Sequence, residues 1–255
     1  MTSTATPFES PYRRLARAKK NISRLEKRIA TFDKAHPGSL IAETDADGIT
    51  THAYKFSRKI PDSWADSAVE AIEALRSALD QCGYAVAVLS GVSNPKNAYF
   101  PFGDSAAELD ANVKGRCKDL PSEISALFRS FDSHERGNYP LWALNKLCNA
   151  NKHRLLIPVG LVTNAATFEM SLSGDGSHFE LPSPVFDPIK NQIVLVKTGP
   201  GNNFKYQIKL AILITFDEFN GVKSWSVPSV LNAIAREVDR VLRTTEAECR
   251  RIGLI

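Results

Sequence analysis

The sequence predicts an α+β fold in which a helical first half precedes a mainly antiparallel sheet of about five strands and a closing helix. In several segments as far as about residue 153, apolar residues recur every three or four positions, as on one face of a helix. From about residue 155 the pattern changes to that of strands, with clear alternation in the last of them. Helical spacing returns after Pro228, and this segregation of helices from strands is typical of α+β proteins.

The first predicted helix covers residues 11–35. Its apolar residues form a seam with spacings of three and four, namely Leu15, Ala18, Ile22, Leu25, Ile29 and Phe32. His36-Pro37-Gly38 is expected to end it. Two short strand-like runs then flank the turn sequence Asp45-Ala46-Asp47-Gly48, so a β-hairpin is predicted at 40–56.

A second long helix is predicted from Asp62 or Ser63 to about Leu89. It carries five acids and one basic residue between positions 62 and 81, so we expect it to pair antiparallel with the basic first helix. Gly83 inside this helix costs about 1 kcal/mol relative to alanine, which suggests that another backbone approaches closely there. The aromatic run at 99–102 is expected to pack on the core.

Shorter helices are predicted at 106–118, at 122–131 and from Pro140 to about Lys152. Strands are predicted at 155–161, 166–172, 178–181, 192–197 and 205–216, joined as an antiparallel meander. The expected organisation is a helical region at 1–154 that includes the hairpin, then a sheet and closing helix at 155–255. We expect the two regions to fold as one cooperative unit.

The composition is that of an ordinary globular protein, with 43% hydrophobic and 24% charged residues. Four scattered cysteines without metal-ligand spacing are expected to be buried, reduced thiols: Cys82, Cys117, Cys148 and Cys249. No signal peptide and no apolar run of about 20 residues is visible, so we expect a cytoplasmic protein without a membrane partner. The sequence has no phosphate-binding loop, nucleophile elbow or zinc-protease motif, and no cofactor or metal is expected.

Positive charge is concentrated in the first helix. Residues 12–28 hold eight basic residues and one acid, a net +7 in a chain whose total is +4. A basic stripe on a helix binds phosphate backbones because each neutralised phosphate releases counterions. Arg13, Arg17, Lys20 and Arg24 are therefore candidate binding residues. The alternative is a solvated face whose charge pairs with the acidic second helix.

The densest polar cluster is Asn149-Ala150-Asn151-Lys152-His153-Arg154, at the end of a predicted helix. Cationic side chains at a helix C-terminus complement the helix dipole, and this structural role is one interpretation. The other is a site in which Asn149, Asn151, Lys152 and Arg154 bind a ligand. In that case His153 would act as a general base or as a phosphate contact.

Three motifs lie within roughly residues 60–160: Leu75-Arg76-Ser77-Ala78-Leu79-Asp80, the Phe100-Pro101 step and the segment 144–154. In these motifs the chain resembles a widespread family of bacterial proteins of uncharacterised activity. That family carries an LRSALDH-like helix, an FP segment and an L-x-x-L-x-N-x-D-K-H-R signature. Here Gln81 stands in place of a frequent His, and Asn151 in place of Asp. The resemblance implies a bacterial origin and a shared fold, and it implies no activity.

A weaker similarity connects the chain to HEPN ribonucleases, helical proteins that cut RNA without a metal. Their signature is an Arg followed by a His after four to six residues, usually paired across a homodimer. Arg129 and His134 have that spacing, whereas Arg76 has Gln81 in the partner position. The extended β region of this chain differs from HEPN proteins. The resemblance implies catalytic roles for His153 or His134 with Arg76 and Arg129.

Two functions from different classes follow from these observations. The first is a non-enzymatic binding module for a protein, a nucleic acid such as RNA, or a small anion, favoured because no intact catalytic signature is present. The second is a metal-independent, HEPN-like ribonuclease. A homodimer is compatible with either function.

Overall fold

The computed structural model describes residues 7–35, 38–153, 159–163, 167–173, 179–180, 186–187, 189–200, 202–209, 212–216 and 225–255. The chain divides into two compact units. One contains residues 1–25, 65–157 and 228–255, and the other contains residues 26–64 and 158–227. This division differs from the expected boundary at residue 154, because the hairpin groups with the strands and the closing helix groups with the other helices.

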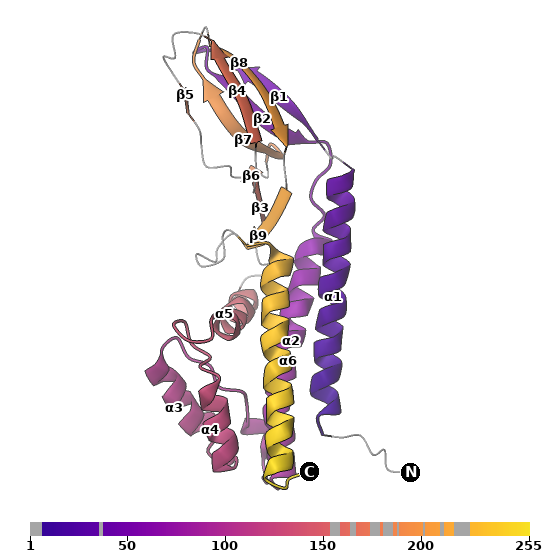
Figure 1. Ribbon diagram of the computed structural model, residues 1–255, viewed down its shortest axis with the longest axis vertical. Coiled ribbons are helices and arrows are strands. Elements are labelled where there is room, and N and C mark those ends of the chain that lie inside the picture. The colour runs from indigo at the N-terminus through magenta and orange to yellow at the C-terminus, as the bar shows by residue number, and fades with distance from the viewer. Residues whose placement is uncertain are drawn as a thin grey trace. The chain divides into compact units, whose positions relative to one another are not determined.

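The described residues form six α-helices, of which the last closes the chain as predicted (Figure 1). They are α1 Glu9–Lys34, α2 Ser63–Leu89, α3 Ala106–Arg116, α4 Ser122–Ser130, α5 Tyr139–His153 and α6 Val227–Arg251. α1 and α2 run antiparallel, as predicted, because Ser10 bonds Gln81 whereas Asn21 bonds Glu70. A residue later in α1 thus contacts a residue earlier in α2, as in an antiparallel pair.

Helix α6 also runs antiparallel to α1, and this contact was not predicted. The hydroxyl of Tyr12 donates to Glu246 at 2.8 Å, and Lys19 donates to Asp239 at 2.9 Å. Figure 1 shows α1, α2 and α6 side by side. The predicted seam of α1 is buried in its first four positions, Leu15, Ala18, Ile22 and Leu25, which are at most 3% exposed.

The loop after α2 returns against that helix at Gly83, as predicted from the cost of a helical glycine. A β-carbon at Gly83 would lie 3.2–3.3 Å from backbone atoms of residues 98–100. Phe100 is fully buried, and its ring centroid lies 5.1 Å from that of Phe102. Tyr99 is 40% exposed, so the prediction that the whole aromatic run packs on the core was wrong at that position. The three residues that follow, Phe100, Pro101 and Phe102, are all buried.

The described residues of the second unit form nine strands: β1 Gly38–Thr44, β2 Thr50–Phe56, β3 Val159–Thr163, β4 Thr167–Ser173, β5 Phe179–Glu180, β6 Phe186–Asp187, β7 Gln192–Thr198, β8 Asn203–Lys209 and β9 Ile212–Phe216. The largest sheet is antiparallel with the order β1-β2-β7-β5. The short strands β5 and β6 both pair with β7, at opposite ends of the same edge, so this sheet is four strands wide. β3 pairs with β9 and β4 pairs with β8, both antiparallel.

The antiparallel character of the strands is confirmed, but the predicted meander of about five neighbouring strands was wrong. Instead, β7 pairs with β2 of the N-terminal hairpin. An isolated two-stranded hairpin is only marginally stable, so the third strand adds to its stability. The other two pairs are nested, with Thr163 facing Ile212 and Thr167 facing Lys209. The predicted strand at 205–216 corresponds to β8 and β9, with residues 210–211 outside the described part.

The predicted hairpin is confirmed between β1 and β2. Its turn has Gly48 at a φ of +76°, a conformation that residues with a side chain rarely adopt. The carboxylate of Asp45 accepts hydrogen bonds from the backbone amides of Asp47 and Ile49. The turn therefore depends on the Asp-x-Asp-Gly chemistry from which it was predicted.

Candidate functional site

Helix α1 separates a buried apolar side from an exposed basic side. Because the apolar seam of α1 is buried, most of the other positions of this helix face solvent. Within the helical unit, α1 has six exposed basic residues: Arg13, Arg14, Arg17, Lys19, Lys20 and Arg24. Four of them, Arg14, Arg17, Lys20 and Arg24, recur at spacings of three and four. Residues at such spacings share one side of a helix. With a rise of about 1.5 Å per residue, the stretch from Arg14 to Arg24 extends over about 15 Å.

Between Glu9 and Leu25, two basic residues of α1 have ion-pair partners in the described structure. Lys19 Nζ lies 2.9 Å from the carboxylate of Asp239 on α6. Arg13 lies 3.9 Å from Glu9, one turn earlier on the same helix, in an exposed pair. The expectation that the charge of α1 pairs with acidic α2 needs correction here, since the helix facing Lys19 is α6.

Four further basic residues of α1, all between positions 14 and 24, have no ion pair within the part of the chain that the structure describes: Arg14, Arg17, Lys20 and Arg24. We call these four residues the α1 stripe. Helix α6 behaves differently, because most of its arginines lie 2.6–2.8 Å from carboxylates three or four residues away: Arg240, Arg243, Arg250 and Arg251. The charge of α6 is thus largely offset within that helix, whereas the charge of the α1 stripe remains available to an external anion.

A hollow lies along α1 beside α2. It is lined by Ala16, Arg17, Lys20, Asn21, Arg24 and Glu70. Asn21 is 4% exposed, and its side-chain amide donates to the carboxylate of Glu70 at 3.0 Å. Three cations and one carboxylate therefore line the same hollow, and a buried amide orients the carboxylate.

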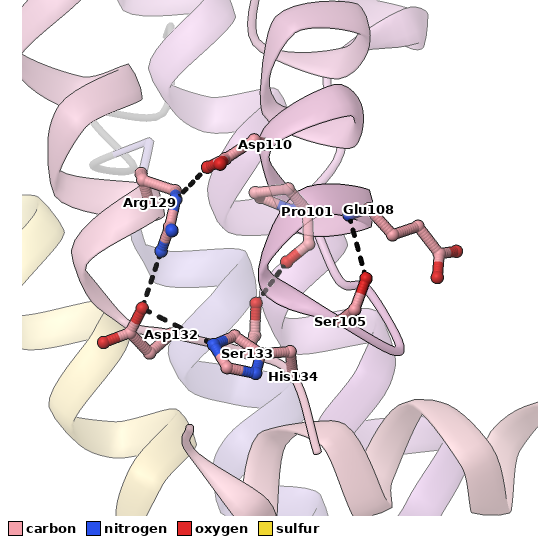
Figure 2. A network of polar contacts seen from close by, with 8 residues as sticks. All are labelled: Pro101, Ser105, Glu108, Asp110, Arg129, Asp132, Ser133 and His134. Atoms are coloured by element: carbon pink, nitrogen blue, oxygen red, sulfur yellow. Dashed lines mark hydrogen bonds and ion pairs between the residues drawn. The ribbon is translucent and has the colours of Figure 1, made fainter. Parts of the chain in front are cut away.

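A second polar network surrounds Arg129 at the end of α4 (Figure 2). Its guanidinium contacts Asp110 of α3 and donates to Asp132 of the following loop at 2.6 Å. His134 Nε2 lies 3.8 Å from the same oxygen of Asp132. The structure therefore brings together two sequence-predicted residues, Arg129 and His134, through a carboxylate that the sequence analysis did not include. Because two carboxylates contact Arg129, much of its charge is offset within the protein.

The loop that presents His134 is held in one conformation by its own backbone. Asp132 has a φ of +50°, and its carbonyl accepts the amides of His134 at 2.7 Å and Asn138 at 2.6 Å. A β-carbon at Gly137 would lie 2.9 Å from His134 Nε2, so no larger residue fits there without movement. The hydroxyl of buried Ser133 donates to the carbonyl of Pro101, in the loop between α2 and α3, as Figure 2 shows. The His134 ring, 13% exposed, is consequently fixed against this loop.

Arg76, the other arginine predicted as catalytic, belongs to a separate cluster. Its Nε donates to Asp80 at 3.2 Å, and a terminal nitrogen donates to Asn145 of α5. The guanidinium carbon lies 4.2 Å from the centroid of the Phe102 ring. Within the described residues no contact joins Arg76 to His134 or to Arg129. Arg76 links α2, α5 and the loop between α2 and α3, which is a structural role.

The polar cluster at the end of α5 is only partly described. Asn149 is exposed. Asn151, Lys152 and His153 belong to the last turn of α5, where the backbone alone is described, and Arg154 lies outside the described residues. The structure therefore places this cluster at a helix C-terminus, as predicted, and does not separate its two interpretations.

Within the described ranges no group of three or more His, Cys, Asp or Glu side chains could hold a metal ion. None of the described helices combines the length and the apolar character needed to cross a membrane. Comparisons with protein-family models, curated proteins and solved structures give no match. The site must therefore be interpreted from its own residues.

The sequence analysis did not predict Asn21 or Glu70 as site residues. Asn21 gave a usable signal, because a polar residue between Ala18 and Leu25, next to Ile22 of the apolar seam, is expected to be partly buried and to need a partner. Glu70 gave none, because it is one of several acids along α2. Only the antiparallel register of α1 and α2 identifies Glu70 as the partner.

Proposed function

We propose that this protein is a binding module that holds RNA by its backbone phosphates along the α1 stripe. One observation carries the proposal: Arg14, Arg17, Lys20 and Arg24 form a row of exposed cations without an ion pair in the described structure. Cations in such a row bind phosphates with a gain in free energy from counterion release.

The regular spacing of the stripe supports a repeating anion rather than a single small one. Side chains one turn apart on a helix are separated by about 5.4 Å along its axis, which is comparable with the spacing of phosphates along a nucleic acid strand. A protein partner would instead be expected to meet an exposed apolar patch at its centre. Three of the six residues that line the hollow beside the stripe are cations, and its one residue with an apolar side chain is the small Ala16.

The test is fluorescence anisotropy with a labelled single-stranded RNA of mixed sequence, titrated with protein at several salt concentrations. Wild type is compared with the triple variant Arg17→Gln, Lys20→Gln and Arg24→Gln. The matched control removes the same charge from α6 through Arg243→Gln, Arg250→Gln and Arg251→Gln, whose side chains already pair with carboxylates. Circular dichroism verifies that both variants keep their helices.

The α1 variant is expected to bind more weakly and to lose about 2 from the magnitude of the slope of log K against log salt, because each phosphate neutralised on a single strand contributes about 0.7. The α6 control should keep the wild-type slope. Equal losses in both variants would show that only the total charge matters. Absence of binding by wild type at low salt would overturn the proposal.

A second candidate function, a metal-independent ribonuclease, is favoured by the approach of Arg129 and His134 to one carboxylate. Histidine can move a proton in RNA cleavage, and an arginine can stabilise the charge that develops on the phosphate. The contacts of Arg129 with Asp110 and Asp132 weigh against it, because they occupy the guanidinium that would hold the phosphate. Binding along α1 is therefore the better supported function.

A further inference from the structure

The hollow beside the α1 stripe contains a carboxylate that a site for phosphate alone would not be expected to include. Glu70 lines it together with Arg17, Lys20 and Arg24. Nevertheless, Glu70 forms no ion pair with these cations or with any other described residue. A carboxylate in this position repels a phosphate group, so its presence needs another explanation.

The carboxylate is oriented by the protein. The buried amide of Asn21 donates to one oxygen of Glu70 at 3.0 Å, and Asn21 is 4% exposed. Burial of that amide would be costly without a partner, so the contact restricts the position of the Glu70 side chain. The second carboxylate oxygen has no hydrogen bond from any described residue. It can accept a hydrogen bond from a ligand in the hollow.

A ligand for this hollow must therefore combine negative charge with N–H donors. A nucleotide with an exocyclic amino group has both, because its phosphate suits the cations and its amino group can donate to the carboxylate. Carboxylates recognise cytosine through its N4 amino group in this way. Uracil presents two carbonyl oxygens beside its single N–H, and those oxygens are repelled by a carboxylate. The base edge is accessible only in an unpaired strand.

We propose that Glu70, oriented by Asn21, makes the hollow a subsite for an amino-bearing base of single-stranded RNA and disfavours uracil. The proposal rests on the proposed function, since the α1 stripe supplies the phosphate contacts. No aromatic residue lines the hollow, so a base in it would stack on the planar guanidinium group of Arg17 or Arg24. In this arrangement the phosphates of the RNA strand contact the α1 stripe, and one base of the strand enters the hollow and faces Glu70.

The experiment compares two labelled decamers that differ only in the base, oligocytidine and oligouridine, by anisotropy at one salt concentration. Wild type is expected to bind oligocytidine about tenfold more tightly, which lies within the range that one base contact supplies. In Glu70→Gln the preference should fall to within about twofold, mainly because oligouridine binds more tightly once the repulsion is removed. Glu73→Gln is the matched control, because Glu73 is an exposed acid on α2 that does not line the hollow.

The outcomes separate this inference from the function on which it rests. If neither decamer binds, or if the α1 triple variant binds both as wild type does, the RNA-binding function fails and the subsite fails with it. If wild type binds both decamers equally through the stripe, the function stands and the subsite is wrong. A preference that survives in Glu70→Gln, or that is lost equally in Glu73→Gln, also overturns the role of Glu70.

Discussion

Arg129 donates a hydrogen bond of 2.6 Å to the carboxylate of Asp132, three residues later in the chain. The same guanidinium contacts Asp110, so the end of α4 is joined to α3 and to the loop that carries His134. The pairs are partly exposed, since the side chains of Asp110 and Asp132 are 50% and 54% accessible. Arg129 therefore organises this region without being strongly desolvated.

Replacing Arg129 with methionine removes its two ion pairs and should lower the free energy of unfolding by only about 1 kcal/mol, because the two half-exposed carboxylates regain water when the guanidinium is lost. Urea denaturation monitored by circular dichroism measures the change. RNA binding should remain at the wild-type level. A variant of unchanged stability that no longer bound RNA would place Arg129 in the binding site.

Gly83→Ala should destabilise the protein although alanine is the better helix former. The added methyl group would meet backbone atoms of residues 98–100 at 3.2–3.3 Å, and backbone cannot move aside as a flexible side chain can. Gly115 of α3 is the matched control, because a β-carbon there meets nothing within 4 Å. Gly115→Ala is expected to stabilise by up to about 1 kcal/mol. Thermal unfolding of both variants gives the comparison, and a gain in stability for Gly83→Ala would contradict the close approach.

All four cysteines should be unreactive in the native protein. Each is buried, and burial raises the pKa of the Cys82 and Cys117 thiols to about 12 and that of Cys249 to about 11. Since the thiolate is the reactive form, titration with Ellman's reagent near neutral pH should show almost no reaction until denaturant is added. Four thiols should then react. Rapid reaction of one thiol in the native state would reveal an opening that the structure does not show.

Stability should depend on pH through Asp104. A hydrogen bond from Lys146 lowers the pKa of Asp104, and the Trp142 indole also donates to it. Because the pKa is lower in the folded than in the unfolded state, the stabilisation is complete above the unfolded value of about 4 and is lost as the pH falls through the folded one. The side chain is 54% exposed, so the contribution stays below about 1 kcal/mol.

Urea unfolding of wild type and Asp104→Asn at pH 7 and at pH 3 measures this contribution. The difference between the two proteins should be largest at pH 7 and should shrink at pH 3. A difference that does not change with pH would show that the carboxylate is not stabilised by Lys146.

Incubation of RNA with the protein in EDTA tests the ribonuclease candidate. If the protein only binds RNA, wild type, His134→Ala and His153→Ala should all leave the RNA intact on a denaturing gel. Metal-free cleavage by wild type that disappeared in His134→Ala alone would establish the enzyme and assign its histidine. Loss in His153→Ala alone would instead transfer the site to the end of α5.

Local features of the fold were predictable because they depend on neighbouring residues. The ends of α2 follow from its apolar spacing, and the hairpin follows from the turn chemistry of Asp45 and Gly48. The basic side of α1 was predictable too, because its basic residues and its apolar residues each recur at helical spacing within one helix. Pairing of the strands was not predictable, since β7 pairs with β2 across more than a hundred residues of intervening chain.

The sequence by itself determined where the helices form, which face of α1 is buried and where its positive charge lies, because spacing and composition decide these locally. Only the tertiary structure decided which of those charges are offset. Packing of α6 against α1 brings Asp239 to Lys19, whereas the register of α2 brings Glu70 to Asn21 instead of to an arginine. The physical reason is that an ion pair depends on distances of a few ångströms between helices that are remote in the chain. Local spacing carries no information about such distances.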